Sequence, residues 1–266
     1  MRIAVLGATG SMGSRVAEAV RRQGHECVAA SRSSGVDAYT GDGLREALDG
    51  VDAVIDCMDL MTTNAEKGRD FFRQVAGNVL DAARLAGVRR VVCLSIAGVA
   101  DGEVNKRFGY YQAKAEHERT YLEAAGGDAV PEVRVLRSAQ WFGFPAQMAG
   151  QLTAGPIALV PTMVTAPVSE DRVAELLVEL AASGAAAGAS DGGDERIVSV
   201  RGPEIGKLRD FIRREQDAVG EVGGKKLRFV LEAPLFGRAV AHGGLVPDEG
   251  LVDQATFGSY LDTLRE

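Results

Sequence analysis

Short apolar runs alternate with amphipathic stretches along the first half of the chain. The runs at residues 3–6, 51–57 and 88–94 are largely apolar, which is typical of strands that are covered on both faces of a parallel sheet. The stretches between them have helical periodicity, and the longest spans residues 65–85 and ends at Gly87. Strands that alternate with helices predict an α/β fold with a doubly wound parallel sheet, because crossover connections are right-handed.

The same pattern predicts elements along the rest of the chain. Further strands are expected at residues 25–30, 36–39, 131–137, 155–161, 197–200 and 227–231. Further helices are expected at residues 44–48, 171–182, 202 onward, 234–240 and 253–264. Residues 185–193 are small and polar, which indicates a flexible surface loop.

Three glycines lie between the first strand and the first helix. Gly7, Gly10 and Gly13 directly follow the apolar run. A helix N-terminus offers unpaired N–H groups, and glycines let a pyrophosphate approach the backbone closely. Two residues, Ala8 and Thr9, separate the first two glycines, where the usual dinucleotide fingerprint has one. The turn predicts a Rossmann-type domain that binds a dinucleotide through Gly7, Thr9, Gly10, Ser11, Met12 and Gly13.

The end of the second strand selects the cofactor. In NAD-binding sites, an acidic residue about 20 positions after the glycine turn bonds the ribose 2′-hydroxyl. Here the strand end holds Ser31, Arg32 and Ser33 instead. A guanidinium and hydroxyls suit a 2′-phosphate, so NADP (NADPH) is favoured over NAD, although a solvated surface arginine is the alternative. Asp42 is a candidate for bonding the adenine and is equally well explained as a turn residue or helix cap.

Residues at the ends of different strands are expected to meet in one place. Ligands of doubly wound sheets bind outside the carboxyl ends of the strands, where the strand order reverses. Gly7, Ser31, Met58 with its neighbour Cys57, and Ser95 all follow predicted strands. We therefore expect these residues to line one crevice and to contact the cofactor.

A second group of polar residues lies beyond Ser95. Lys114 follows Tyr110 by four residues, so on a helix the two side chains share a face. An ammonium beside a phenol lowers the pKa of the phenol, and such a tyrosine can exchange a proton with a carbonyl oxygen that a serine also holds. The alternative is a tyrosine that only packs and a lysine whose stem covers apolar surface.

Five motifs carry a resemblance to a known superfamily. They are GATGSMG at 7–13, VVCLS at 91–95, YYQAK at 110–114, VLRSAQWF at 135–142 and the stretch 165–174. On them the chain resembles the short-chain dehydrogenases/reductases and, within that superfamily, the atypical NmrA-like NAD(P)-binding group. The resemblance implies that Tyr110 is the acid, that Lys114 positions the nicotinamide ribose and assists Tyr110, and that Ser95 binds the substrate oxygen.

Three functions are compatible with this resemblance. The catalytic set Ser95, Tyr110 and Lys114 favours an NADP-dependent oxidoreductase, a reductase that moves a hydride between NADPH and a small carbonyl or conjugated apolar substrate. Some NmrA-like proteins instead act as non-catalytic NADP(H) sensors that regulate a protein partner. A nucleotide-sugar epimerase-like isomerase ranks last, because the sequence contains no evident second basic patch for a diphosphate.

The C-terminal part is expected to complete the substrate site. We expect a single NAD(P)-binding domain over residues 1–266, with a small substrate-binding lobe formed mainly by about 139–170 and 200–266. Gln140, Trp141, Phe142 and Phe144 follow a predicted strand and include the only tryptophan. They are candidates for the wall of an apolar substrate pocket, and core packing between sheet and lobe is the alternative.

The charge and hydropathy of the chain limit the kinds of partner that we expect it to bind. The 266 residues carry a net charge of −7 with scattered basic residues, so nucleic acid is not expected as a partner. No apolar segment approaches the roughly 20 residues of a membrane span. We expect no signal peptide, because Met1-Arg2 leads straight into a predicted strand and a glycine turn. We expect a cytoplasmic monomer or homodimer that binds a small-molecule substrate and no membrane.

The cysteines and histidines suggest no metal chemistry. Cys27, Cys57 and Cys93 are an odd count at wide spacing, which favours buried thiols in a reducing compartment. No metal site is expected, because no cluster of potential ligands has the required spacing. His25 and His117 are expected to be structural, with His117 on the exposed side of its helix.

Overall fold

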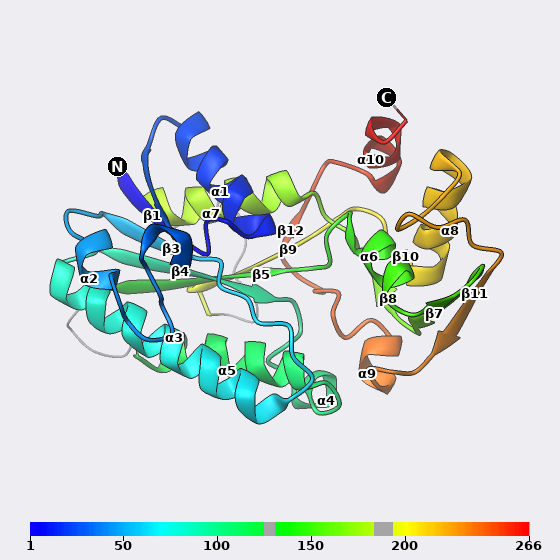
Figure 1. Cartoon of the computed structure of the whole chain (residues 1–266), viewed down its shortest axis with the longest axis horizontal. Helices are drawn as coiled ribbons and strands as arrows, with labels where there is room; N and C mark the ends of the chain where they lie inside the picture. The colour runs from blue at the N-terminus through cyan, green and yellow to red at the C-terminus, as the bar shows by residue number, and fades with distance from the viewer. Residues whose placement is uncertain (125–130, 184–193, 266) are drawn as a thin grey trace.

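The centre of the computed structural model is a sheet of seven parallel strands (Figure 1). The structure describes residues 1–124, 131–183 and 194–265. The strand order is β12-β9-β5-β4-β3-β1-β2, and it reverses at β1, which pairs with β2 on one side and β3 on the other. The strands are β1 (Arg2–Leu6), β2 (Glu26–Ala30), β3 (Ala53–Asp56), β4 (Arg90–Ile96), β5 (Glu132–Ser138), β9 (Ile197–Arg201) and β12 (Leu251–Val252). The predicted doubly wound α/β fold is confirmed.

Helices cover both faces of this sheet (Figure 1). One layer holds α1 (Ser11–Arg22) and α7 (Glu170–Ser183), and the other holds α2 (Leu44–Ala47), α3 (Ala65–Ala86) and α5 (Gly109–Ala124). Side chains of a strand alternate between the two faces, and here both faces are apolar. Ile3 and Val5 pack with the first layer, while Ala4 and Leu6 pack with the second. This double burial explains why the strands lack a polar face in the sequence.

A smaller lobe lies beside the carboxyl end of the sheet (Figure 1). It contains a mixed sheet of order β11-β7-β6 and a two-stranded pair of β8 and β10. Its strands are β6 (Thr153–Ala154), β7 (Ile157–Pro161), β8 (Val164–Thr165), β10 (Gly206–Lys207) and β11 (Phe229–Ala233). The remaining helices are α4 (Gly102–Asn105), α6 (Phe144–Gln151), α8 (Leu208–Val219), α9 (Arg238–Ala241) and α10 (Phe257–Thr263).

Two predicted elements are wrong for local reasons. Residues 36–39 form no strand, and a turn covers residues 38–40, because the Asp37 side chain accepts hydrogen bonds from the amides of Tyr39 at 2.9 Å and Thr40 at 3.4 Å. The helix expected from residue 202 begins only at Leu208, after β10 has paired with β8. A Cβ on Gly202 would lie 1.7 Å from the Pro167 carbonyl oxygen, so this glycine serves a close approach of two chain segments.

Other predicted boundaries shift by a few residues. The helices expected at 234–240 and 253–264 are shorter, namely α9 and α10. The loop predicted over 185–193 lies outside the described residues. No helix in the described ranges is long and apolar enough to cross a membrane.

Candidate cofactor and active site

The glycine turn joins β1 to α1 in a conformation that requires glycine at two places. Gly7 has φ of +71°, a left-handed conformation that side chains disfavour. A Cβ on Gly13 would lie 2.0 Å from the Gly7 carbonyl oxygen, so only glycine lets α1 approach the turn this closely. Gly10 precedes the first residue of α1, and no side chain caps the helix there. The first N–H groups of α1 are therefore available to an anion.

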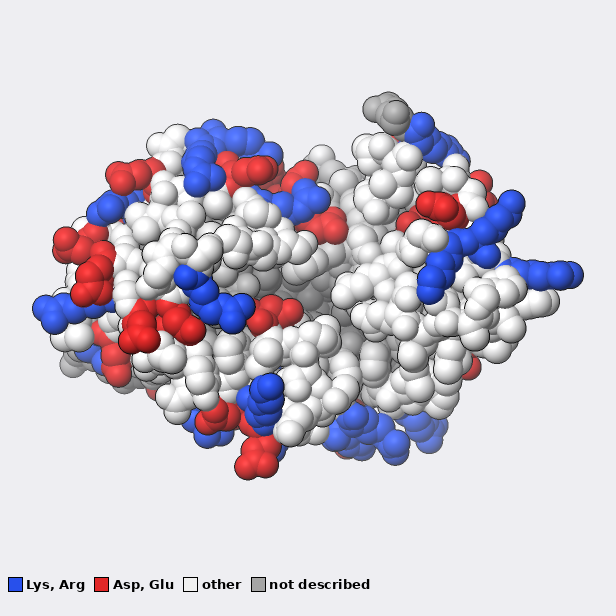
Figure 2. All heavy atoms as spheres, viewed as in Figure 1, with Lys and Arg blue, Asp and Glu red and all other residues white. Residues whose placement is uncertain are grey.

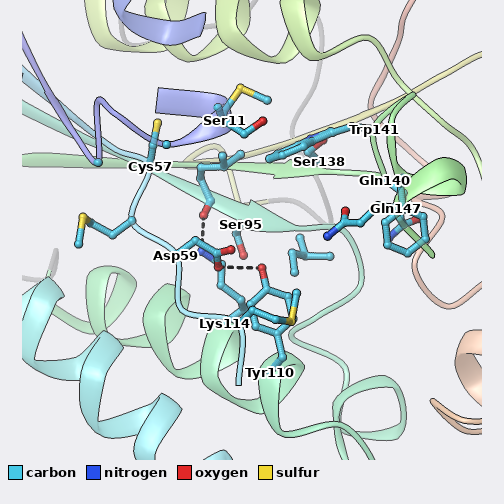
Figure 3. Close-up of a pocket in the computed structure, with 18 of the residues that line it drawn as sticks. Ser11, Cys57, Asp59, Ser95, Tyr110, Lys114, Ser138, Gln140, Trp141 and Gln147 are labelled. Carbon is cyan, nitrogen blue, oxygen red and sulfur yellow. Dashed lines mark hydrogen bonds between the residues drawn. The ribbon is translucent and has the colours of Figure 1, made fainter. Parts of the chain in front are cut away.

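A cavity of about 870 Å³ lies between the glycine turn, the strand ends and the lobe. In Figure 2 the surface is hollowed between the two parts of the molecule, and Figure 3 shows the side chains inside. The predicted site residues that line it are Gly7, Thr9, Gly10, Ser11, Met12, Ser31, Arg32, Cys57, Met58, Ser95, Tyr110, Lys114, Gln140, Trp141 and Phe144. The strand ends thus meet in one crevice, as predicted.

Four candidate residues lie outside the cavity lining. Gly13 belongs to the packing of the turn rather than to its surface. The hydroxyl of Ser33 hydrogen-bonds that of Ser31 at 2.8 Å. The Asp42 carboxylate accepts a hydrogen bond from the Thr40 hydroxyl at 2.8 Å, which fits its interpretation as a turn residue. Phe142 packs against the rings of Phe257 and Tyr260 in α10, which fits the core-packing alternative.

The Arg32 guanidinium lies where it can bind an anion. It begins a short 3-10 helix (Arg32–Ser34) directly after β2 and is exposed at the cavity edge. Within the described residues, its guanidinium has no hydrogen-bond or ion-pair partner. Its position beyond β2, next to β1, is the place where the ribose of a dinucleotide lies in doubly wound sheets.

Tyr110 faces a carboxylate instead of an ammonium. Its hydroxyl donates a hydrogen bond to Asp59 Oδ1 at 2.9 Å (Figure 3). Burial raises the pKa of the Tyr110 phenol well above its ordinary value, and the charge and hydrogen bond of Asp59 raise it further. The expectation that Lys114 lowers this pKa is therefore wrong in this structure. Sequence spacing could not reveal Asp59, because it lies 51 residues away in the loop after β3.

Ser95 lies at the end of β4 with its hydroxyl already bonded. The hydroxyl donates to Glu118 Oε2 at 2.6 Å, and the residue is only 2% exposed. Glu118 also forms a buried ion pair with Arg137 of β5. The proton of Ser95 thus points to α5, and only the oxygen of this hydroxyl remains to accept a bond from a ligand.

Lys114 is buried beneath the cavity, and its hydrogen bonds go to groups other than the Tyr110 hydroxyl. Its Nζ donates to the Leu94 carbonyl oxygen at 2.8 Å, lies 3.2 Å from His117 Nδ1 and sits 4.8 Å from the centre of the Phe72 ring. The expectation that His117 is exposed is wrong, because its side chain is fully buried against Asp56. A polar residue on a charged helix resembles a surface residue, so the sequence held no signal for this contact.

The part of the cavity beside the lobe is mainly apolar. Trp141 lies on its wall with its indole Nε1–H donating to the Ser138 hydroxyl at 3.1 Å. Residues that sequence reasoning did not single out complete this wall, notably Ile96, Phe108, Met148, Leu152, Leu159 and Phe236. They come from separate segments that meet only in the folded chain. One of these residues, Leu152, is 54% exposed.

A protein-family model matches the N-terminal part of the chain. Residues 7–130 match the family model described as NAD(P)H-binding, which is similarity over the part of the chain that holds the glycine turn. The matched residues include the glycine turn, Arg32, Tyr110 and Lys114, whereas Trp141 and Phe144 of the apolar wall lie beyond them.

Solved structures share the fold of the whole chain. The UDP-glucose 4-epimerase of Thermotoga maritima, with UDP-glucose, has a TM-score of 0.71 and 14% identity, over 100% of this chain and 97% of its own. The UDP-glucose 4-epimerase of Thermus thermophilus, in complex with NAD, has a TM-score of 0.66 and 20% identity, over 100% of this chain and 99% of its own. A short-chain dehydrogenase/reductase superfamily protein from Agrobacterium tumefaciens with bound NAD has a TM-score of 0.66 and 15% identity, over 100% of this chain and 96% of its own.

These likenesses show that the fold is shared beyond residues 7–130. The neighbours extend over the lobe as well as over the seven-stranded sheet, so the likeness in fold includes both parts of this chain. No curated protein sequence matches the chain.

Proposed function

We propose that the protein is an NADPH-dependent reductase of a small apolar carbonyl or conjugated compound, with Tyr110 as the proton donor. The observation that carries this proposal is the cavity itself. It brings the helix N-terminus at Gly10, a phenol at Tyr110 and an apolar wall into one space. Those are the three requirements of a hydride-transfer site: a place for the dinucleotide, a proton donor and a pocket for the substrate.

The residues that match the family model fit the cofactor from end to end. The open N-terminus of α1 suits the pyrophosphate, because its N–H groups carry partial positive charge. The exposed Arg32 guanidinium suits a 2′-phosphate, which supports NADP over NAD. Lys114 lies at the other end of the crevice, where its ammonium can bind a ribose hydroxyl. When bound, the reduced nicotinamide supplies a hydride to the substrate.

The state of Tyr110 favours reduction. Burial and the Asp59 carboxylate raise the pKa of the phenol, so it keeps its proton at neutral pH. Reduction of a carbonyl creates an alkoxide, which is a stronger base than a phenolate and takes that proton readily. Oxidation of an alcohol would need Tyr110 as a phenolate, and the same surroundings disfavour that form. On binding, the substrate oxygen takes the place of Asp59 at the phenol.

The charges along the cavity point to the substrate class. Among the described residues that line it, Arg32 and Lys114 are the cations, and both belong to the expected cofactor half. The half beside the lobe carries Trp141, Phe144 and other apolar side chains, and the glutamine amides of the lining are those of residues 140, 147 and 151. The carboxylate of Glu170 also lines the cavity and accepts a hydrogen bond from the Gly143 amide. This combination suits an apolar molecule with a single polar group, because burying a diphosphate without a cation is costly.

A nucleotide-sugar isomerase is the second candidate, and the fold likeness favours it. Two structural neighbours are UDP-glucose 4-epimerases that span the full length of this chain. An epimerase returns the hydride to its substrate, so it needs a cofactor site but consumes no NADPH. Incubation with UDP-glucose and NAD would then form the 4-epimer, and a constant sugar composition would exclude this function.

A cofactor sensor without catalysis is the third candidate. Such a protein would hold a partner protein more tightly with NADP than with NADPH, or the reverse. Pull-down from lysate with each form of the cofactor tests this, and a partner retained equally with both forms, or none, would exclude it.

Two matched tyrosine variants test the proposed reductase. Tyr110 and Tyr111 are neighbours on α5 and both line the cavity, but only Tyr110 bonds Asp59. We expect NADPH consumption with at least one member of a panel of apolar aldehydes, ketones and enones. Tyr110→Phe should lower kcat about 10²–10⁴-fold, the usual contribution of a general acid. Tyr111→Phe should retain most of the activity. A fully active Tyr110→Phe variant would remove Tyr110 as the proton donor.

A further inference from the structure

A chain of buried hydrogen bonds lies below the cavity and is not explained by the reaction alone. It joins Asp56, the last residue of β3, to His117 and Lys114 on α5. Asp56 and His117 are completely buried, and Lys114 is 4% exposed. His117 Nε2 lies 2.9 Å from Asp56 Oδ2, and His117 Nδ1 lies 3.2 Å from Lys114 Nζ. A buried carboxylate and a buried ammonium are thus bridged by an imidazole.

The neighbours of Asp56 show that it is a carboxylate that only accepts. Its Oδ1 accepts a hydrogen bond from the Met58 amide at 2.7 Å, and its Oδ2 accepts one from the Tyr121 hydroxyl at 2.7 Å. Burial would raise the pKa of Asp56, but the adjacent His117 and these hydrogen bonds hold it below its usual value. Because an ionised carboxylate has no proton to donate, His117 must carry a proton on Nε2.

The neighbours of His117 complete the assignment. Burial and the Lys114 ammonium lower the pKa of His117, so the imidazole is neutral and Nδ1 has a free lone pair. Lys114 can only donate, so this lone pair accepts from its ammonium. The Cys93 thiol lies 3.6 Å from the same nitrogen, and burial raises the pKa of Cys93, so it adds no charge. Each group in this chain of hydrogen bonds therefore acts as the donor or the acceptor that its chemistry allows.

These contacts determine the orientation of the Lys114 ammonium. An ammonium has three N–H donors, and here one binds the Leu94 carbonyl oxygen while a second binds His117 Nδ1. One donor remains, and Lys114 lines the cavity (Figure 3). The backbone and the imidazole therefore fix the direction of the third donor.

We propose that Asp56 and His117 are positioning residues that aim the Lys114 ammonium at the cofactor. Asp56 fixes the tautomer of His117, and His117 Nδ1 holds Lys114 so that its free donor faces the nicotinamide ribose. This inference rests on cofactor binding in the cavity, but it does not rest on the reductase reaction. Its test therefore does not depend on which substrate the protein uses.

The tautomer can be measured without cofactor or substrate. Long-range ¹H–¹⁵N correlation spectra of the protein distinguish protonated from unprotonated ring nitrogens. The chain contains three histidines, and His117→Gln identifies the signal of His117. We expect a neutral His117 with its proton on Nε2 in the wild-type protein. A proton on Nδ1 would overturn the proposal, whatever the variants do.

Asp56→Asn tests the link from Asp56 to Lys114. Met58 donates to one oxygen of this carboxylate, so the new amide nitrogen takes the side that faces His117 and Tyr121. It then donates to Nε2 and drives the imidazole proton to Nδ1, as an amide does in Ser-His-Asp triads. A protonated Nδ1 cannot accept from Lys114. We expect the tautomer to switch and the Kd for NADPH to rise about ten-fold, the usual loss for a hydrogen bond to a charged donor.

A double-mutant cycle separates positioning from structural damage. Lys114→Met should weaken NADPH binding to a similar extent, and the double variant Asp56→Asn/Lys114→Met should bind no more weakly than Lys114→Met. The matched control is Asp52→Asn, a carboxylate outside the cavity that bonds Arg89 and the Arg2 amide at the other end of β3. It should leave the Kd within two-fold. Additive losses, or an unchanged Kd in Asp56→Asn, would overturn the proposal.

Discussion

A methyl group at Gly13 should damage both the turn and cofactor binding. A Cβ at this position would lie 2.0 Å from the Gly7 carbonyl oxygen and 2.7 Å from its carbon. Both atoms belong to the backbone, so α1 must move away from the turn by about 1 Å or more to restore contact. Overpacking of this kind costs about 3 kcal/mol, which corresponds to a fall in Tm of about 6–12 °C for a chain of this size.

Gly77→Ala provides the matched control. Gly77 is also a helical glycine, in α3, and no atom lies within 4 Å of its hypothetical Cβ. Alanine there should stabilise the protein by up to about 1 kcal/mol through helix propensity. Thermal unfolding and titration of NADPH fluorescence measure both effects. We expect Gly13→Ala to raise the Kd more than ten-fold, because the N–H groups of α1 leave their positions. A Gly13→Ala variant with wild-type Tm and Kd would refute the derived geometry of the turn.

Two further predictions concern the charged groups. Arg32→Ala should raise the Kd for NADPH about ten-fold or more and leave the Kd for NADH within two-fold, since the guanidinium is expected to bind only the 2′-phosphate; equal changes for both nucleotides would contradict that assignment. The pKa of His117 is lowered in the folded protein, so the unfolded chain binds the extra proton first as the pH falls. The free energy of unfolding from urea titrations should therefore decrease below about pH 6.5, with a contribution of at most about 1.4 kcal/mol per pH unit from this residue, and His117→Phe should remove that contribution. A pH dependence that persists unchanged in His117→Phe would assign it to other groups.

The sequence was sufficient where structure follows from local pattern. The apolar runs predicted the parallel strands because both faces of the sheet are buried, and the spacing of Gly7, Gly10 and Gly13 predicted the turn that joins β1 to α1. The convergence of Ser31, Met58 and Ser95 also followed, since carboxyl ends of parallel strands meet at one edge.

The contacts that set the chemistry are long-range, and pattern alone did not contain them. Asp59 meets Tyr110 across 51 residues, and Asp56 meets His117 across 61. Lys114, His117 and Glu118 look like the polar face of a surface helix, yet each is buried against a partner from the sheet. Tertiary hydrogen bonds offset the desolvation of these groups, and a periodicity argument counts only polarity.

Hydride transfer itself gives the most direct test of the central claim. The protein would be incubated with NADPH deuterated at C4 of the nicotinamide, separately in each configuration, and with a carbonyl substrate from the panel. Mass spectrometry would then locate the label. The account predicts one deuterium per product molecule on the carbon that was the carbonyl, from one configuration of the cofactor only. An unlabelled product, or an isomer of the substrate formed without loss of NADPH, would contradict it.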